Sequence, residues 1–158
     1  MESPLNIQVS SSVLPENFIS SIHKKILSKS PETMITINQM IMELQTTLST
    51  KELIKIFIRH LSSFIDFDQY RFNNEKIDIF IENNSSAVHT CCYDLSLNQD
   101  HLGKITFSRI EPFDGWELEN IENHLASLVF PLRNAKEHEK LRDLIEKNQE
   151  LYEDSLIF

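Results

Sequence analysis

Glycine and positive charge are scarce in this sequence. Only two of its 158 residues are glycine, which argues against an all-β fold with tight turns and against a glycine-rich phosphate-binding loop. There are 15 Lys and Arg residues against 24 Asp and Glu residues, so the formal net charge is -9. Because phosphate binding needs clustered basic side chains, nucleic acid is not an expected partner.

Long apolar runs are missing as well. The longest run of its kind, "LIKIFI", is far shorter than the roughly 20 residues of a membrane-spanning helix. The N-terminal segment "MESPLNIQVSSS" lacks the basic flank and apolar core of a signal peptide. The two cysteines, Cys91 and Cys92, are adjacent on a predicted strand and point to opposite faces, so they are not expected to pair. These features predict a cytoplasmic protein that does not contact a membrane.

Helical periodicity dominates the first part of the chain. Residues 1–30 are predicted to be flexible, apart from a short amphipathic helix that opens at Pro15. In the next helix, apolar residues recur at gaps of 3 and 4, as in a coiled coil. They are Met34, Ile37, Ile41, Leu44 and Leu48. Ser49 and Glu52 have the spacing of a capping box, so a further helix is predicted to begin there.

The period then changes to two. Apolar and polar residues alternate in "DQYRFN", "KIDIFIEN", "HTCCYDLSLN" and "GKITFSR", with turn-forming segments such as "NNEK" and "NQDHLG" between them. This pattern predicts a four-stranded antiparallel meander with one apolar and one polar face. Arg71 and Phe80 depart from the alternation.

The segment "HLGKITFSRIEPFDGWELENIENHL", residues 101–125, joins the last strand to a long helix. Asp114, followed by Glu117 three residues later, predicts an N-cap with a capping box. An apolar stripe follows from Leu118 to Ala135, and Pro131 is expected to kink this helix or to weaken a hydrogen bond in it.

A charged tail, "KEHEKLRDLIEKNQELYED", continues the helix and resumes an apolar stripe out of register with the first. Asn148 falls on this stripe, where a buried Asn often fixes the register of a coiled coil. Charged residues are spaced for helix-stabilising pairs four residues apart. The pairs are Arg142–Glu146 and Asp143–Lys147.

With these residues the chain resembles a GAF-like sensor domain, of the reduced type found N-terminal to bacterial GGDEF-type diguanylate cyclases. The resemblance rests on "LQTTLSTKELIKIFIRHLSSFIDFDQYRF" (44–72), on residues 89–135 and on the helical run after them. Its most specific part is "LGKITFSR" followed by "WELENIENHLASLVFPLRNA". It implies an α+β fold, in which a GAF-like antiparallel sheet packs on long N- and C-terminal helices and a C-terminal coiled coil follows. It also implies that the first and last helices of two protomers pack as a bundle and lead into an output domain.

The predicted organisation has three parts. Residues 1–30 form a flexible N-terminus with a short helix, residues 31–135 the GAF-like domain, and residues 136–158 the coiled-coil signalling helix. A homodimer is expected, built on the apolar stripes of the helices. Its predicted interface residues are Met34, Ile37, Ile41, Leu44, Leu128, Leu132, Leu141, Leu144, Asn148 and Leu151.

No catalytic, cofactor-binding or metal-binding residue is predicted. His89, Cys91, Cys92 and His101 are potential metal ligands, but a structural zinc site needs about four well-placed ligands, and Cys92 points away from the face that His89 and Cys91 share. Cys91 is better explained as a small buried apolar residue. His60, His124 and His138 lie on predicted helices without the neighbours that nucleophilic catalysis requires.

These observations predict a non-enzymatic, dimeric signalling module that acts on an output domain or a partner protein. One alternative is the regulatory half of a diguanylate cyclase, and no catalytic motif follows the helical tail. The other alternative is a small-molecule or thiol sensor, although the strand connections are too short to carry a lid over a pocket. The sequence identifies no small-molecule ligand, and no cofactor is expected.

Overall fold

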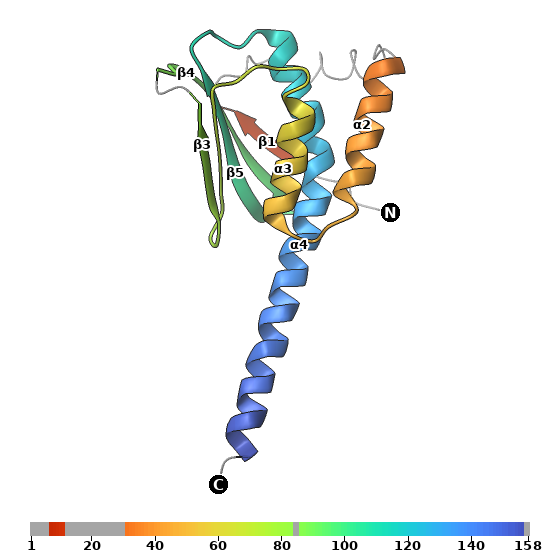
Figure 1. The fold of residues 1–158 in the computed structure, drawn as a ribbon, viewed down its shortest axis with the longest axis vertical. Coiled ribbons are helices and arrows are strands. Elements are labelled where there is room, and N and C mark those ends of the chain that lie inside the picture. Colours follow the sequence, from red (N-terminus) through yellow and green to blue (C-terminus); the bar gives the residue numbers. More distant parts are fainter. Residues whose placement is uncertain (1–6, 12–30, 84–85, 157–158) are drawn as a thin grey trace.

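A five-stranded antiparallel sheet is covered on one face by two helices, and a third helix packs against these two on the side away from the sheet (Figure 1). The last helix continues far beyond the sheet. The computed structural model describes residues 7–11, 31–83 and 86–156. The elements in chain order are β1 (Ile7–Ser11), α2 (Pro31–Leu44), α3 (Thr50–Leu61), β2 (Gln69–Asn73), β3 (Asp78–Glu82), β4 (His89–Leu97), β5 (Asp100–Arg109) and α4 (Gly115–Leu156). The predicted α+β class, with an antiparallel sheet and a long C-terminal helix, is confirmed.

The predicted meander is wrong, because the strand order is β1-β4-β5-β2-β3. Two hairpins, β2-β3 and β4-β5, join through β2 and β5, so β3 and β4 are not neighbours. The strongly buried strand β5 lies between two neighbouring strands. Strand β3 lies at the edge of the sheet, where its charged end residues Asp78 and Glu82 can stay in water. Residues 7–11, predicted to be flexible, add β1 beside β4, and the helix predicted from Pro15 lies outside the described residues.

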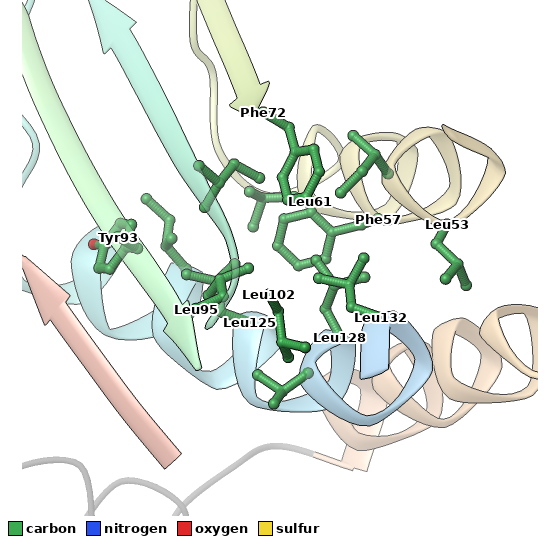
Figure 2. Packing of buried hydrophobic residues seen from close by; sticks show 14 of the residues in the cluster. Leu53, Phe57, Leu61, Phe72, Tyr93, Leu95, Leu102, Leu125, Leu128 and Leu132 are labelled. Carbon is green, nitrogen blue, oxygen red and sulfur yellow. The ribbon is translucent and has the colours of Figure 1, made fainter. Parts of the chain in front are cut away.

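The two faces of the sheet differ as the alternation predicts. On β4, the apolar residues Cys91, Tyr93 and Leu95 are buried, whereas Thr90 and Asp94 are exposed. The buried side chains of the sheet meet those of α3 and α4 in one core. Figure 2 shows this packing for Leu53, Phe57, Leu61, Phe72, Tyr93, Leu95, Leu102, Leu125, Leu128 and Leu132.

The helix α2 is shorter than predicted. It ends at Leu44, so Leu48 lies exposed in the connection to α3. The N-cap of α3 is Ser49, whose Oγ accepts a hydrogen bond from the backbone N–H of Glu52 at 3.5 Å, which confirms the predicted start of that helix. Met40, which lies off the predicted stripe, is fully buried with Leu44.

The first testable consequence concerns Gly103 in β5. Its φ is +157°, and a Cβ there would lie 2.6 Å from Cε2 of Phe72. Residues other than glycine rarely adopt this backbone conformation, and the buried Phe72 ring has little room to move away from an added Cβ. Gly103→Ala is therefore expected to lower the free energy of unfolding by about 1–3 kcal/mol. Urea denaturation measures the change. Gly115→Ala is the matched control, since a Cβ added at Gly115 would meet no atom within 4 Å, and an equal loss in both variants would contradict the prediction.

Candidate functional site

The predicted interface residues fall into three groups in the structure. Leu44, Leu128 and Leu132 are fully buried in the core of the single chain, so they have no surface left to share with a partner. Ile37 and Ile41 are half-buried on α2, and the side chain of Met34 lies outside the described part of the structure. The four tail positions are exposed. They are Leu141, Leu144, Asn148 and Leu151. The interface itself stays a prediction, and the exposed tail residues are its strongest members.

The tail presents a wider apolar stripe than the sequence pattern indicated. Six large apolar side chains there are 50% to 65% exposed. They are Leu141, Leu144, Ile145, Leu151, Tyr152 and Leu156, of which Ile145, Tyr152 and Leu156 were not predicted. Together with Asn148 they follow helical spacing, with about three stripe positions in each seven residues rather than the two of a strict coiled coil. We refer to these seven residues as the tail stripe.

The strand–helix joint that precedes α4 is built as predicted. The backbone N–H of Glu117 donates to Oδ1 of Asp114 at 2.8 Å, and the N–H of Asp114 donates to Oε1 of Glu117 at 3.2 Å. This reciprocal capping box satisfies two backbone donors at the helix start. The helix then runs without interruption through Pro131 to Leu156.

Arg109, the last residue of β5, holds this joint together. Its guanidinium donates to both carboxylate oxygens of Glu117 at 2.5 Å, and both side chains are largely buried, at 12% and 15% exposure. The bidentate contact with Arg109 holds the pKa of Glu117 below its usual range, although burial opposes this shift. The guanidinium also lies 4.3 Å from the centre of the Phe113 ring.

The same guanidinium bonds three backbone carbonyls of the surrounding loops. It donates to the carbonyl of Asp66 at 3.0 Å, to that of Glu111 at 3.0 Å and to that of Pro112 at 2.8 Å. Arg109 therefore ties the end of β5, the loop before β2 and the start of α4 into one unit. Sequence reasoning missed this role, because Asp66 is distant from Arg109 in the chain.

Two lysine–aspartate contacts attach α4 to the hairpin ends of the sheet farther along. Lys136 on α4 donates to Oδ1 of Asp100 at 2.5 Å and to the carbonyl of His101 at 2.9 Å, both in the β4-β5 hairpin. Lys76 in the β2-β3 turn donates to Oδ2 of Asp143 on α4 at 2.6 Å. Asp143 thus pairs with Lys76 rather than with Lys147, its predicted partner. The two contacts link each hairpin directly to α4.

A small cavity lies between these two contacts. Its volume is about 80 Å³, and Leu102 and Leu132 line it together with Lys76, Lys136 and Lys140. Sites for drug-sized ligands typically occupy about 300–1,000 Å³. The cavity therefore suits a few water molecules better than a nucleotide-sized ligand.

The cysteines occupy opposite faces of β4. Cys91 is buried, and burial raises the pKa of its thiol to about 12, so it stays protonated at neutral pH. Cys92 faces the polar side, where its Sγ accepts a hydrogen bond from Oγ1 of Thr106 at 3.4 Å. Within the described residues, no group of three or more His, Cys, Asp or Glu side chains is arranged to hold a metal ion.

One buried acidic group on α4 is unexpected from the sequence. Glu122 is 7% exposed, and its Oε1 finds no hydrogen-bond partner among the described residues. Burial, and secondarily the negative charge of nearby Glu119, raises the pKa of the Glu122 carboxyl from 4.5 to about 8. The folded chain is therefore most stable when the Glu122 carboxyl is protonated.

This pKa makes stability depend on pH. Between pH 4.5 and about 8 the folded chain keeps a proton on Glu122 that the unfolded chain releases, so stability declines as the pH rises through this window. The decline is expected to be on the order of 3 kcal/mol, at about 1.4 kcal/mol per pKa unit with an allowance for partial solvation. Glu122→Gln should abolish most of it in urea titrations at pH 5.5, 7 and 9. The exposed Glu146→Gln is the control, and an unchanged pH dependence in Glu122→Gln would refute the assignment.

Comparison of the chain with protein-family models, curated proteins and solved structures finds no match. None of the described helices combines the length and the apolarity needed to cross a bilayer.

Proposed function

We propose that this chain is a non-enzymatic, dimeric regulatory module whose α4 tails pair and pass a conformational signal to an output domain or partner protein. The observation that carries the proposal is the exposed tail stripe. Residues 140–156 are all exposed in the single chain, and a helix of this size standing alone in water is only marginally stable. Burial of a Leu-sized side chain stabilises by about 1.5–3 kcal/mol, so a second tail would supply the missing stabilisation.

Parallel pairing fits the stripe best. It brings each stripe residue next to its own copy and sets Asn148 opposite Asn148, where the two side-chain amides can hydrogen-bond. The paired tails would then leave both sheets at the same end of the assembly. The resemblance to a GAF-like input module agrees with this arrangement.

The contacts of α4 with the sheet supply a route for the signal. Arg109 fixes the start of α4, while Lys136 and Lys76 attach the helix to the two hairpin ends. A shift of either hairpin would change the position of α4 and so bias the packing of the paired tails. The output implied by the resemblance is a diguanylate cyclase, which such a module would regulate.

The small-molecule and thiol-sensor alternatives receive less support. The cavity of about 80 Å³ is small for an organic ligand. The candidate thiol, Cys92, is half-buried and already accepts a hydrogen bond from Thr106, and the Cys91 thiol is buried with a raised pKa. The polar face of the sheet, around Thr90 and Asp94, is exposed.

Mass and distance measurements on the full chain test the proposal. Sedimentation equilibrium is expected to give a dimer at micromolar concentration, and a monomer at 100 µM would overturn the proposal. Spin labels at Glu137→Cys and, separately, at Glu153→Cys, both with Cys92→Ser, report the direction of pairing. Parallel tails keep the two copies of each label level along the axis, so each label pair is separated only across the helix pair. This separation is short at Glu137, on the stripe side, and longer at Glu153, on the opposite side. Antiparallel tails centred on Asn148 would separate the two Glu137 labels by about 33 Å along the axis, which would contradict the parallel arrangement.

A further inference from the structure

The strand β3 forms an edge of the sheet with unusual exposure of apolar side chains. It pairs with β2 on one side, and the strand order leaves its other side unpaired among the described residues. Phe80 is 51% exposed and Ile81 is 43% exposed. Soluble proteins usually protect such edges, because a free edge strand can pair with another extended segment.

The hydrogen bonds of the hairpin show which backbone groups point outward. The N–H of Asn74 donates to the carbonyl of Ile77 at 2.9 Å, and the N–H of Asn83 donates to the carbonyl of Asp68 at 2.8 Å. In an antiparallel pair, the residues bonded to the neighbouring strand alternate along the chain. The odd-numbered residues of β3 therefore bond to β2, and the even-numbered residues point their N–H and C=O groups away from the sheet. The outward residues are Asp78, Phe80 and Glu82.

The charges along this edge select the kind of partner. Arg71 binds Asp78 through two hydrogen bonds, at 2.9 Å and 2.6 Å, and neutralises it. Within the described residues, Glu82 accepts a hydrogen bond from the uncharged amide of Gln69 at 3.1 Å, so its negative charge stays uncompensated. The edge thus combines outward backbone groups, an apolar centre at Phe80 and a free negative charge at one end.

From this arrangement we propose that β3 binds an extended peptide segment as an added strand, with an apolar centre and basic flanking residues. The added strand would hydrogen-bond to the outward backbone groups and place a Lys or Arg near Glu82, while its apolar side chains contact Phe80 and Ile81. A second copy of β3 fits less well, because antiparallel pairing centred on Phe80 sets Glu82 opposite Asp78 of the partner strand. Asp78 offers no cation, and its Arg71 is already engaged, so the charge of Glu82 would stay uncompensated. This proposal is independent of the tail stripe and goes beyond the function proposed above.

Binding of two labelled peptides to the full chain tests the proposal. The probes are fluorescein-labelled Lys-Thr-Val-Thr-Val-Thr-Lys and its counterpart with Glu in place of both Lys residues, measured by fluorescence anisotropy. The basic peptide is expected to bind at least tenfold more tightly than the acidic one. Absence of saturable binding of the basic peptide at 1 mM protein would overturn the proposal.

Two variants distinguish strand addition from non-specific binding of the peptide. Phe80→Pro removes an outward N–H while leaving the bonds to β2 in place, and edge strands tolerate proline at such positions, so it should weaken binding at least tenfold. Glu82→Lys keeps every backbone group and should reverse the preference between the two peptides. It therefore remains decisive if Phe80→Pro fails to fold.

Trp116→Ala is the matched control, because Trp116 is also 51% exposed but lies on α4. It should leave binding unchanged, and an equal loss in this variant would refute a site at β3. The wild-type chain could instead form oligomers larger than the dimer, and Phe80→Pro could convert them to dimers. In that case the β3 edge binds a second copy of the chain, and the peptide proposal is wrong.

Discussion

Replacing Leu144 and Leu151 together with aspartate is expected to convert the dimer into monomers without unfolding the sheet. Both side chains are more than half exposed in the single chain, so the core does not depend on them. In the paired tails, each substitution removes about 1.5–3 kcal/mol of apolar burial per chain and places a carboxylate against its own copy. The dissociation constant should therefore rise at least a thousandfold. Light scattering and sedimentation measure the mass, and circular dichroism should show a loss of helix confined to the tail.

The matched control changes two charges on the opposite side of the same tail. Glu146→Lys with Glu153→Lys alters net charge but leaves the tail stripe intact, so the dimer should persist. Two results would count against tail pairing. One is an unchanged dimer mass for the aspartate variant, and the other is an equal loss of dimer in the control.

Substitution of Arg109 is expected to give the largest loss of folding stability among the charged residues of the joint. Arg109→Met leaves Glu117 as a largely buried carboxylate without its cation, and it also removes three donors to loop carbonyls. Loss of one partner from such a pair typically costs about 3–5 kcal/mol. Urea denaturation near pH 7 measures this loss.

A double-mutant cycle and a pH series distinguish the ion pair from simple packing. In the Arg109→Met background, Glu117→Gln removes the buried carboxylate that has lost its cation. The double variant should therefore be more stable than Arg109→Met alone. The pKa of Glu117 is lowered in the folded chain, so the pair stabilises above the ordinary carboxyl pKa of 4.5 and its contribution disappears as the pH falls through the folded value. Arg109→Met should therefore lose this part of the acid sensitivity. Additive losses in the cycle would refute the ion-pair explanation.

Features set by neighbouring residues could be predicted from the sequence. Asp114 and Glu117 form their capping box because the two residues are only three apart, and the alternation in β4 separates buried Cys91 from half-buried Cys92 for the same local reason. The strand order could not be predicted in this way. It depends on which hairpin edges meet, and β2 pairs with β5 across a long stretch of chain.

The candidate site was predicted only in part, for a related reason. A stripe with gaps of 3 and 4 has the same form whether it packs inside one chain or between two chains. Leu128 and Leu132 are core residues, while Leu144 and Leu151 on the same helix are exposed. The contact of Lys76 with Asp143 spans 67 residues, so the local pattern favoured the pair with Lys147 instead.

Pro131 within the uninterrupted helix α4 has a mechanical consequence. Proline has no N–H, so the carbonyl of Ser127 lacks its usual helical donor, and bending is easiest at this level. The remaining 25 residues to Leu156 form a lever of about 37 Å. A bend of about 5° at Pro131 would displace the far end of α4 sideways by roughly 3 Å, which amplifies a small movement near the hairpins.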